Sequence, residues 1–539
     1  MTGSGTTSGS DNAARPLLIN IAANFGGQAS GVILSLVAIP IYISLVGMES
    51  FGLIGVSLTV QGILRILDFG LTPSINRQMA RYAVEPDSRR EMRDFAKTCE
   101  LLFGVAGLVV GFGLVLLLPS FARHWLNAEE LSSRTIGSCA VMMGVLCGFQ
   151  WPISFYRGGL MGLERQILCN GLRVVEATLS YVGGVLVLVL IEPTIETLFL
   201  WQVAVSTIMT VTLAVAFRRK LPATEARPTL RFSLVKKVWH FAAGMTAISI
   251  TALVMTHVDK VVISKLLTLT TFGYYTLAVY VAGGVTALII TPIFNAMFPR
   301  FSSLTAVGDE DGLRELYHLS LQMTAVCILP VVATLSCFAD VAIMLWTRNP
   351  ETTRNVSPLL SVYIIGTGLN GLMNAPYALQ LATGNTRLPV TINFILIAVF
   401  VPAVCLLVPD YGALACAWIW TLLMALYLVV GIPITHRYLL KGETYRSWTA
   451  DLAPAFLASV VVVGLGYQLS RSLSSLSSQT VATALSGLTA LTVAALCSSR
   501  VRKLLPWWTP QRSPKSSRSR LENDDKVECA NANPSEKVR

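Results

Sequence analysis

The chain has 539 residues, of which 53% are hydrophobic and 13% are charged, and its mean hydropathy is +0.62. Soluble domains carry about 25% charged residues, so this composition excludes an ordinary soluble protein and predicts one that crosses the membrane many times. A formal net charge of +11 can indicate nucleic-acid binding, but most lysines and arginines here lie between apolar spans, where they set topology. We therefore expect no nucleic-acid partner.

The ten cysteines include no C-x-x-C pair and no cluster with histidine at metal-ligand spacing. Most of them, Cys139 and Cys416 among them, lie in apolar runs and should behave as small buried side chains. The nucleotide-binding motif G-x-x-x-x-G-K-S/T is also absent from the sequence. The sequence thus predicts no disulfide framework, no metal site and no cofactor.

Apolar spans fill most of the chain. Residues 1–16 are polar and carry no basic region ahead of a short apolar core, so we predict a disordered N-terminus and no cleaved signal peptide. Fourteen spans follow, each of the length that a bilayer crossing requires, about 20 residues. They lie at 17–46, 51–80, 98–119, 135–160, 168–191, 195–217, 241–264, 271–298, 317–345, 357–382, 388–408, 412–436, 449–468 and 479–499.

The distribution of lysine and arginine predicts the orientation. These residues gather in the connections on one side, at 81–97, 218–237, 437–446 and from 500 onward. The opposite side holds only Arg123, Arg134, Lys265, Arg348, Arg354 and Arg471. By the positive-inside rule, and because the number of spans is even, both termini should be cytoplasmic.

The spans divide into two sets of six. We predict a first lobe at 17–217, a basic cytoplasmic linker at 218–240 and a second lobe at 241–436. A further pair of helices occupies 437–499. The tail, 500–539, is rich in serine, lysine and arginine, so we expect it to be disordered and to lie on anionic membrane lipids.

The two lobes share a sequence pattern at a nearly constant offset. Phe51-Gly52 corresponds to Phe272-Gly273 at a shift of 221 residues. Gly162–Arg165 corresponds to Gly384–Arg387 at a shift of 222. Both lobes begin on the same side, so the repeat is parallel, with its axis along the membrane normal. Such a repeat is typical of transporters that rock two lobes about a central cavity.

Several charged residues interrupt the apolar spans. A charge near the bilayer centre costs roughly 2.5–3.5 kcal/mol, so it is rarely left facing lipid. Arg65 and Asp68 are three residues apart on one helix face, where they either form a structural ion pair or line a polar cavity. Asp259 and Lys260 are adjacent, so their side chains should point about 100° apart and should not form a tight pair.

Motifs in both lobes carry a family resemblance. Asn20–Gly52 is followed by Leu67–Leu71, and Val258–Ser264 is followed by Phe272–Ala278 with its Gly-Tyr-Tyr. Together they resemble polysaccharide flippases of the multidrug/oligosaccharidyl-lipid/polysaccharide exporter superfamily, over roughly residues 17–440. The resemblance implies an all-α polytopic membrane protein of about 14 transmembrane helices, with two six-helix lobes in a V shape plus two C-terminal helices.

The resemblance also implies a function. The protein would flip an undecaprenyl-diphosphate-linked oligosaccharide across the bacterial inner membrane by alternating access, for the synthesis of O-antigen, capsule or exopolysaccharide. A polysaccharide polymerase or other assembly proteins would be its partners.

The diphosphate of such a cargo can be bound by intramembrane arginine through two parallel hydrogen bonds. The candidate cations are Arg65, Arg157, Arg77, Arg173 and Lys260. For Arg77 and Arg173 the alternative is a side chain that extends to the lipid headgroups. The candidate carboxylates, which either couple transport to an ion or form structural ion pairs, are Asp259 first, then Asp68 and Glu176.

Two other functions stay open. An ion-coupled multidrug exporter of the same superfamily would need an acidic or apolar cavity for cationic cargo, whereas basic residues outnumber acidic ones inside these spans. A membrane polymerase or glycosyltransferase would need a substantial outer loop with paired carboxylates or a catalytic Arg/His set, and the predicted outer loops are short. We therefore predict a flippase and not an enzyme.

Overall fold

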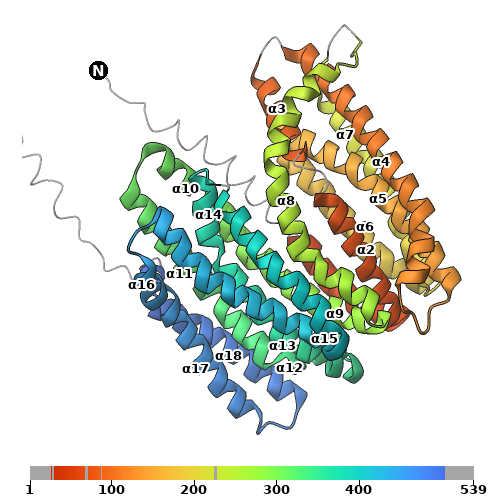
Figure 1. The fold of residues 1–539 in the computed structure, drawn as a ribbon. Coiled ribbons are helices and arrows are strands. Elements are labelled where there is room, and N and C mark those ends of the chain that lie inside the picture. Colours follow the sequence, from red (N-terminus) through yellow and green to blue (C-terminus); the bar gives the residue numbers. More distant parts are fainter. Residues whose placement is uncertain are drawn as a thin grey trace, which may run out of the picture.

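The computed structural model describes residues 26, 29–66, 71–85, 88–223, 227–385 and 387–503, with the backbone alone at 66, 235–249 and 252. Over these residues the chain is almost entirely helical (Figure 1). Eleven of the described helices are long and apolar enough to cross a membrane, which confirms the predicted all-α polytopic fold. The predicted N-terminal tail, Asp68 and most of the C-terminal tail lie outside the described residues.

The first half of the chain contributes a helix at Ala29–Val46 and six further helices. These are α2 Met48–Ile66, α3 Leu71–Val84, α4 Arg89–Trp125, α5 Ser133–Gly162, α6 Gln166–Leu190 and α7 Ile195–Lys220.

The second half repeats this series and adds a helix pair. Its members are α8 Phe232–Leu266, α9 Leu269–Val285, the π-helical turn η2 Thr286–Ile290, α10 Thr291–Val307, α11 Glu310–Cys337, α12 Ala339–Thr347, α13 Pro350–Leu372, α14 Asn374–Ala382 and α15 Arg387–Leu439. After these come α16 Thr444–Arg446, η3 Ser447–Leu452, α17 Ala453–Ser470, α18 Leu476–Cys497 and α19 Ser499–Arg502. α15 carries two predicted spans and is broken at Gly412, whose φ is 67°.

The structure describes the predicted span 51–80 in two parts, because residues 67–70 lie outside the described residues. α2 is described to Ile66 and α3 from Leu71. Pro73 lies in the first turn of α3, where a missing N–H and a fixed φ are tolerated. α3 packs on α5, with Met79 against Gly162.

Figure 1 shows two helical bundles, one built from α3–α7 in orange to yellow and the other from α10–α18 in green to blue. Buried aromatic rings fill each core: Phe155 contacts Phe103 and Phe217 in the first bundle, and Tyr363 contacts Trp420 in the second. α8 belongs to both bundles, since it contacts α3 and α4 of the first and α15 of the second.

The internal repeat is visible in the helix boundaries. α9 begins 221 residues after α2, α11 begins 221 after α4, and α15 begins 221 after α6. At the N-termini of α2 and α9 the contacts are reciprocal. Gly52 lies against the carbonyl of Leu269, and Gly273 lies against the carbonyl of Met48, with no space for a Cβ in either place. Each helix thus makes the same contact with the other, so α2 and α9 are related by a pseudo-twofold axis that runs between them.

One predicted match was wrong by two residues. The turn after α5 places Glu164 at a φ of 58°, and the turn after α14 places Gly384 at a φ of 73°. In both turns the residue after this position donates its N–H to a carbonyl five residues back, a common way to end a helix. Gly384 therefore corresponds to Glu164 and not to Gly162, at a shift of 220.

The two halves meet at one end through the loop after α4, hereafter the closed end. Asn127 Nδ2 donates to the Lys265 carbonyl at 2.8 Å, and the N–H of Leu269 donates to the Asn127 carbonyl at 2.9 Å. Beside them, Trp125 Nε1 donates to Ser264 Oγ at 3.1 Å. The glycine contacts of α2 and α9 lie at this same end, since Leu269 takes part in both.

The predicted linker 218–240 is helical at both ends and fixed in its middle. α7 extends to Lys220 and α8 begins at Phe232. The N–H of Thr229 donates to Asp94 Oδ1 at 2.6 Å, and Arg231 Nε lies 3.1 Å from Asp94 Oδ2. Asp94 is fully buried on α4, so these residues hold the start of α8 against the first bundle.

Candidate functional site

Three helices of the first half of the chain, α2, α5 and α6, bring arginines together within stretches that are predicted to span the membrane. Arg157 of α5 forms an ion pair with Glu176 of α6, and each of these side chains is about a quarter exposed (26% and 27%). Arg65 of α2 lies within electrostatic reach of Arg157, Glu176 and Arg173. These four residues, hereafter the arginine cluster, contain three guanidinium groups and one carboxylate, so the cluster carries a surplus of positive charge.

A second polar group lies on α8 and faces the second bundle. Asp259 is 2% exposed, and its Oδ2 accepts a hydrogen bond from Tyr275 Oη at 2.6 Å. Lys260 Nζ lies 3.0 Å from the same oxygen and 2.7 Å from the Thr256 carbonyl. The prediction that Asp259 and Lys260 do not pair was wrong, because the flexible lysine stem turns the ammonium back over the preceding turn of the helix.

His257 lies between these two groups. The backbone of α2 at Gly62 packs against the imidazole of His257. The ring is within electrostatic reach of Arg65 on one side and of Lys260 and Asp259 on the other. The polar groups on α2, α5, α6 and α8 are therefore neighbours, although they come from both halves of the chain.

The remaining candidates stand apart or lie outside the described residues. Arg77 is exposed on α3, whereas Arg65 lies near the described end of α2. Arg173 is an exposed member of the arginine cluster. Asp68 falls in 67–70, outside the described residues, so its predicted pairing with Arg65 stays a prediction.

The sequence reasoning missed a row of uncharged polar side chains beside the arginine cluster. Gln150 Nε2 of α5 donates to Gln61 Oε1 of α2 at 2.7 Å, and Gln61 Nε2 donates to Ser57 Oγ at 3.0 Å. We refer to Ser57, Gln61 and Gln150 as the amide row. A signal was present, since Ser57, Gln61 and Arg65 recur every four residues and so share one face of an otherwise apolar helix.

It also missed a buried ionic network that attaches the C-terminal helices. His318 of α11 is fully buried; its Nδ1 contacts Asp451 of η3, and its Nε2 lies 3.1 Å from Glu443. Gln322 Nε2 donates to Asp451 Oδ1 at 2.8 Å, and Gln322 Oε1 accepts the N–H of Arg500 at 2.9 Å. Both ring nitrogens of His318 thus face carboxylates, one from Asp451 and one from Glu443.

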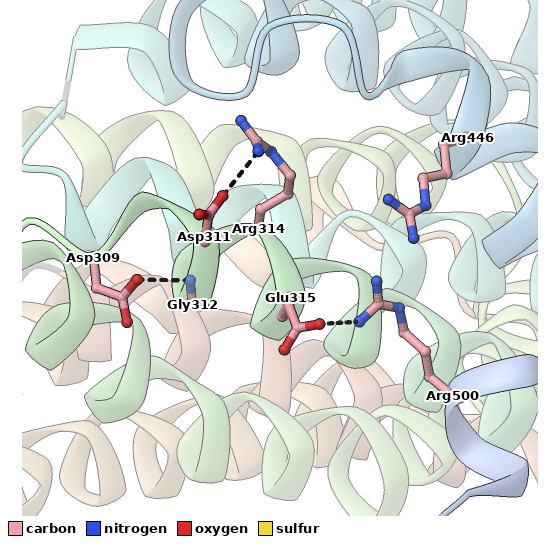
Figure 2. Close-up of a pocket in the computed structure, with 7 residues that line it drawn as sticks. All are labelled: Asp309, Asp311, Gly312, Arg314, Glu315, Arg446 and Arg500. Atoms are coloured by element: carbon pink, nitrogen blue, oxygen red, sulfur yellow. Dashed lines mark hydrogen bonds and ion pairs between the residues drawn. The ribbon is translucent and has the colours of Figure 1, made fainter. Parts of the chain in front are cut away.

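A pocket of about 520 Å³ opens next to this network (Figure 2). Figure 2 shows two ion pairs among the lining residues. Arg314 lies 3.2 Å from Asp311, and Arg500 lies 3.7 Å from Glu315. The complete lining is Asp309, Asp311, Gly312, Arg314, Glu315, Arg446 and Arg500. Its cations are thus already paired with carboxylates. Among the described residues no group of three or more His, Cys, Asp or Glu could hold a metal ion.

Comparison with known proteins places the chain in a family. Residues 44–347 match the family described as polysaccharide biosynthesis protein. A Shigella flexneri protein assigned as an O-antigen transporter is 19% identical over 407 residues, which cover 75% of this chain and 94% of the relative. The lipopolysaccharide biosynthesis protein WzxC of Escherichia coli (strain K12) is 23% identical over 447 residues, which cover 81% of this chain and 84% of the relative.

Solved structures share the fold. The lipid II flippase MurJ in an inward closed conformation matches with a TM-score of 0.67 at 13% identity, over 89% of this chain and 98% of MurJ. An inward-facing multidrug resistance MATE family transporter matches with a TM-score of 0.63 at 12% identity, over 77% of this chain and 96% of the transporter. The family resemblance inferred from the motifs is confirmed: this multi-pass membrane protein belongs to the polysaccharide biosynthesis protein family, and it shares its fold with solved transporters of the multidrug/oligosaccharidyl-lipid/polysaccharide exporter superfamily.

Proposed function

We propose that the protein flips an undecaprenyl-diphosphate-linked oligosaccharide from the cytoplasmic to the periplasmic leaflet of the bacterial inner membrane. The observation that carries this proposal is the arginine cluster, in which three guanidinium groups surround one carboxylate. A surplus of positive charge is costly inside a membrane unless an anion compensates for it. The relatives assigned to O-antigen transport and lipopolysaccharide biosynthesis support the choice of a lipid-linked glycan as the anion.

In this proposal the ion pair between Arg157 and Glu176 is exchanged for an ion pair with the cargo. The guanidinium of Arg157 can offer a diphosphate two parallel hydrogen bonds, and Arg65 and Arg173 supply charge nearby. Glu176 then loses its ion-pair partner, and we propose it as the carboxylate that couples cargo binding to an ion gradient. Asp259 is the weaker coupling candidate, because Lys260 and Tyr275 already compensate its charge; we propose a structural ion pair there.

The transport cycle we propose is alternating access between the lobes 17–217 and 241–436. With both termini assigned to the cytoplasm, the closed end faces the periplasm, and the structure is a state shut on that side. Breaking the Asn127–Lys265 and Trp125–Ser264 hydrogen bonds would be required for release outward. We further propose that the basic tail lies on anionic lipids and that a polymerase or assembly protein receives the cargo.

The test follows the cargo between leaflets in a strain that lacks the protein. Lipid-linked oligosaccharide is counted on each leaflet with an enzyme added to sealed vesicles. We expect complete units to accumulate on the cytoplasmic leaflet and the wild-type gene to clear them. Since a hydrogen bond to a charged group contributes about 1.5–3 kcal/mol, Arg157→Ala should slow clearance about tenfold or more.

The matched control is Arg354→Ala, which removes an exposed arginine of α13 and should leave clearance unchanged. Units that reach the outer leaflet normally and stay unpolymerised would contradict the flippase and favour a polymerase. If the lipid-linked units reach the outer leaflet and are polymerised normally, and the strain becomes sensitive to cationic drugs, the multidrug exporter would be favoured.

A further inference from the structure

The amide row continues the arginine cluster in one direction. Gln61 precedes Arg65 by four residues on α2, and Gln150 precedes Arg157 by seven on α5, so each glutamine shares a helix face with an arginine. At 1.5 Å of rise per residue, the amides lie about 6 Å and about 10 Å further along their helices.

On both helices the glutamine lies nearer to the closed end than the arginine does. The N-terminus of α2 lies there, because Gly52 contacts Leu269. The loop before α5 lies at the same end, since the carboxylate of Glu49 accepts the N–H groups of Glu129 and Glu130, each at 2.7 Å. The order along the site is therefore arginines first and amides second, going toward the closed end.

The hydrogen-bonding capacity of the amide row is only partly used by the described residues. A glutamine amide has two N–H donors and a carbonyl acceptor with two lone pairs. The chain from Gln150 through Gln61 to Ser57 uses one donor of each glutamine and one lone pair of Gln61. One donor of each glutamine and the carbonyl of Gln150 are left for a ligand, and both side chains are partly exposed.

These groups differ chemically from the arginine cluster. A neutral amide that both donates and accepts suits a hydroxyl or an acetamido group, which also does both. It offers a diphosphate no charge compensation. Next to a site for diphosphate, the group that needs such partners is the sugar attached directly to it.

We propose that Gln61 and Gln150 form a subsite for the first sugar of the lipid-linked glycan. This inference rests on the proposed function. The diphosphate binds at the arginine cluster, and the sugar lies deeper, against the closed end, so the cargo enters with its glycan leading and its polyprenyl tail left in the lipid.

The test compares two probes on the purified full-length protein in lipid nanodiscs: undecaprenyl diphosphate, and the same lipid carrying one N-acetylhexosamine. We expect the wild type to bind the glycosylated probe more tightly. Gln61→Leu and Gln150→Leu should each reduce that preference about fivefold, the effect of losing one hydrogen bond. In both glutamine variants the affinity for undecaprenyl diphosphate should change less than about twofold. Arg157→Ala should instead weaken the binding of both probes.

Gln202→Leu is the matched control, because Gln202 Nε2 makes an interhelical hydrogen bond to the Ser180 carbonyl at 3.1 Å in the same half of the chain. Gln150→Met, unbranched and similar in size to glutamine, repeats the test if leucine disturbs folding. A preference that survives in the glutamine variants, or is absent from the wild type while undecaprenyl diphosphate still binds, would overturn the subsite and leave the flippase standing. Binding of neither probe to the wild type would overturn both.

Discussion

Gly52 of α2 and Gly273 of α9 make the same contact in opposite directions, each with its Cα against a carbonyl of the other helix. The two helices thus touch backbone to backbone where the halves of the molecule meet. A side chain at either position would have to push a carbonyl away, and overpacking of this kind costs about 1–3 kcal/mol.

Gly52→Ala and Gly273→Ala should therefore loosen the closed end. We expect cross-linking between cysteines placed by Asn127→Cys and Thr268→Cys to fall severalfold, since these residues form an isolated backbone bridge there. Gly113→Ala is the control, because a Cβ at Gly113 would meet nothing within 4 Å. Equal cross-linking in all three alanine variants would show that the glycine contacts do not hold this end shut.

Glu176→Gln should tighten the binding of undecaprenyl diphosphate and slow its release. The substitution preserves the size of the side chain but removes the carboxylate that occupies Arg157, so the cargo no longer competes for the guanidinium. The measurement is equilibrium binding combined with the rate of transfer between leaflets. Glu192→Gln, at an exposed residue beyond the end of α6, is the control. Unchanged affinity would mean that Glu176 does not compete with the cargo.

His318→Ala should destabilise the protein by about 3–5 kcal/mol, because it leaves the buried carboxylate of Asp451 without its His318 partner, whereas Glu443 keeps Arg314 at 3.0 Å. Thermal unfolding in detergent is the measurement. Adding Asp451→Asn should restore part of the loss, since it removes the carboxylate that lost its partner. His124→Ala, at an exposed histidine, should change the stability by less than about 0.5 kcal/mol. A wild-type melting curve for His318→Ala would contradict the ionic network.

Asp94→Asn should release residues 227–231 from α4. The carboxylate holds both the N–H of Thr229 and the guanidinium of Arg231, and an amide cannot satisfy both with the same strength. Limited proteolysis from the side opposite the closed end should cut this segment several times faster in the variant. Asp311→Asn, whose side chain is 93% exposed, provides the comparison. Equal cutting rates would show that the segment is held by other contacts.

Hydropathy and charge predicted most of the fold, because membrane-spanning helices need long apolar runs whatever they pack against. The repeat register was predicted within two residues, and its error at Glu164 arose because a glutamate occupies a backbone position where the other half has glycine.

The candidate site was predicted only in part. The arginines were recognisable singly, as charges in apolar runs, but the pairing of Arg157 with Glu176 depends on how α5 packs with α6. The network at His318 joins residues more than 120 positions apart, and no local pattern reports such a contact. The amide row was missed because neutral polar residues interrupt hydropathy less than charges do.

α8 is tied to α4 near both of its ends, by Arg231 on Asp94 at one and by Ser264 on Trp125 at the other, while between them it packs on α15. In the alternating-access cycle proposed above, the second bundle would pivot about whichever attachment holds. If the buried Asp94 attachment holds and the Trp125 attachment breaks, the pivot would be the Arg231 end of α8. The relative strength of two attachments on one helix would then decide which side of the protein opens.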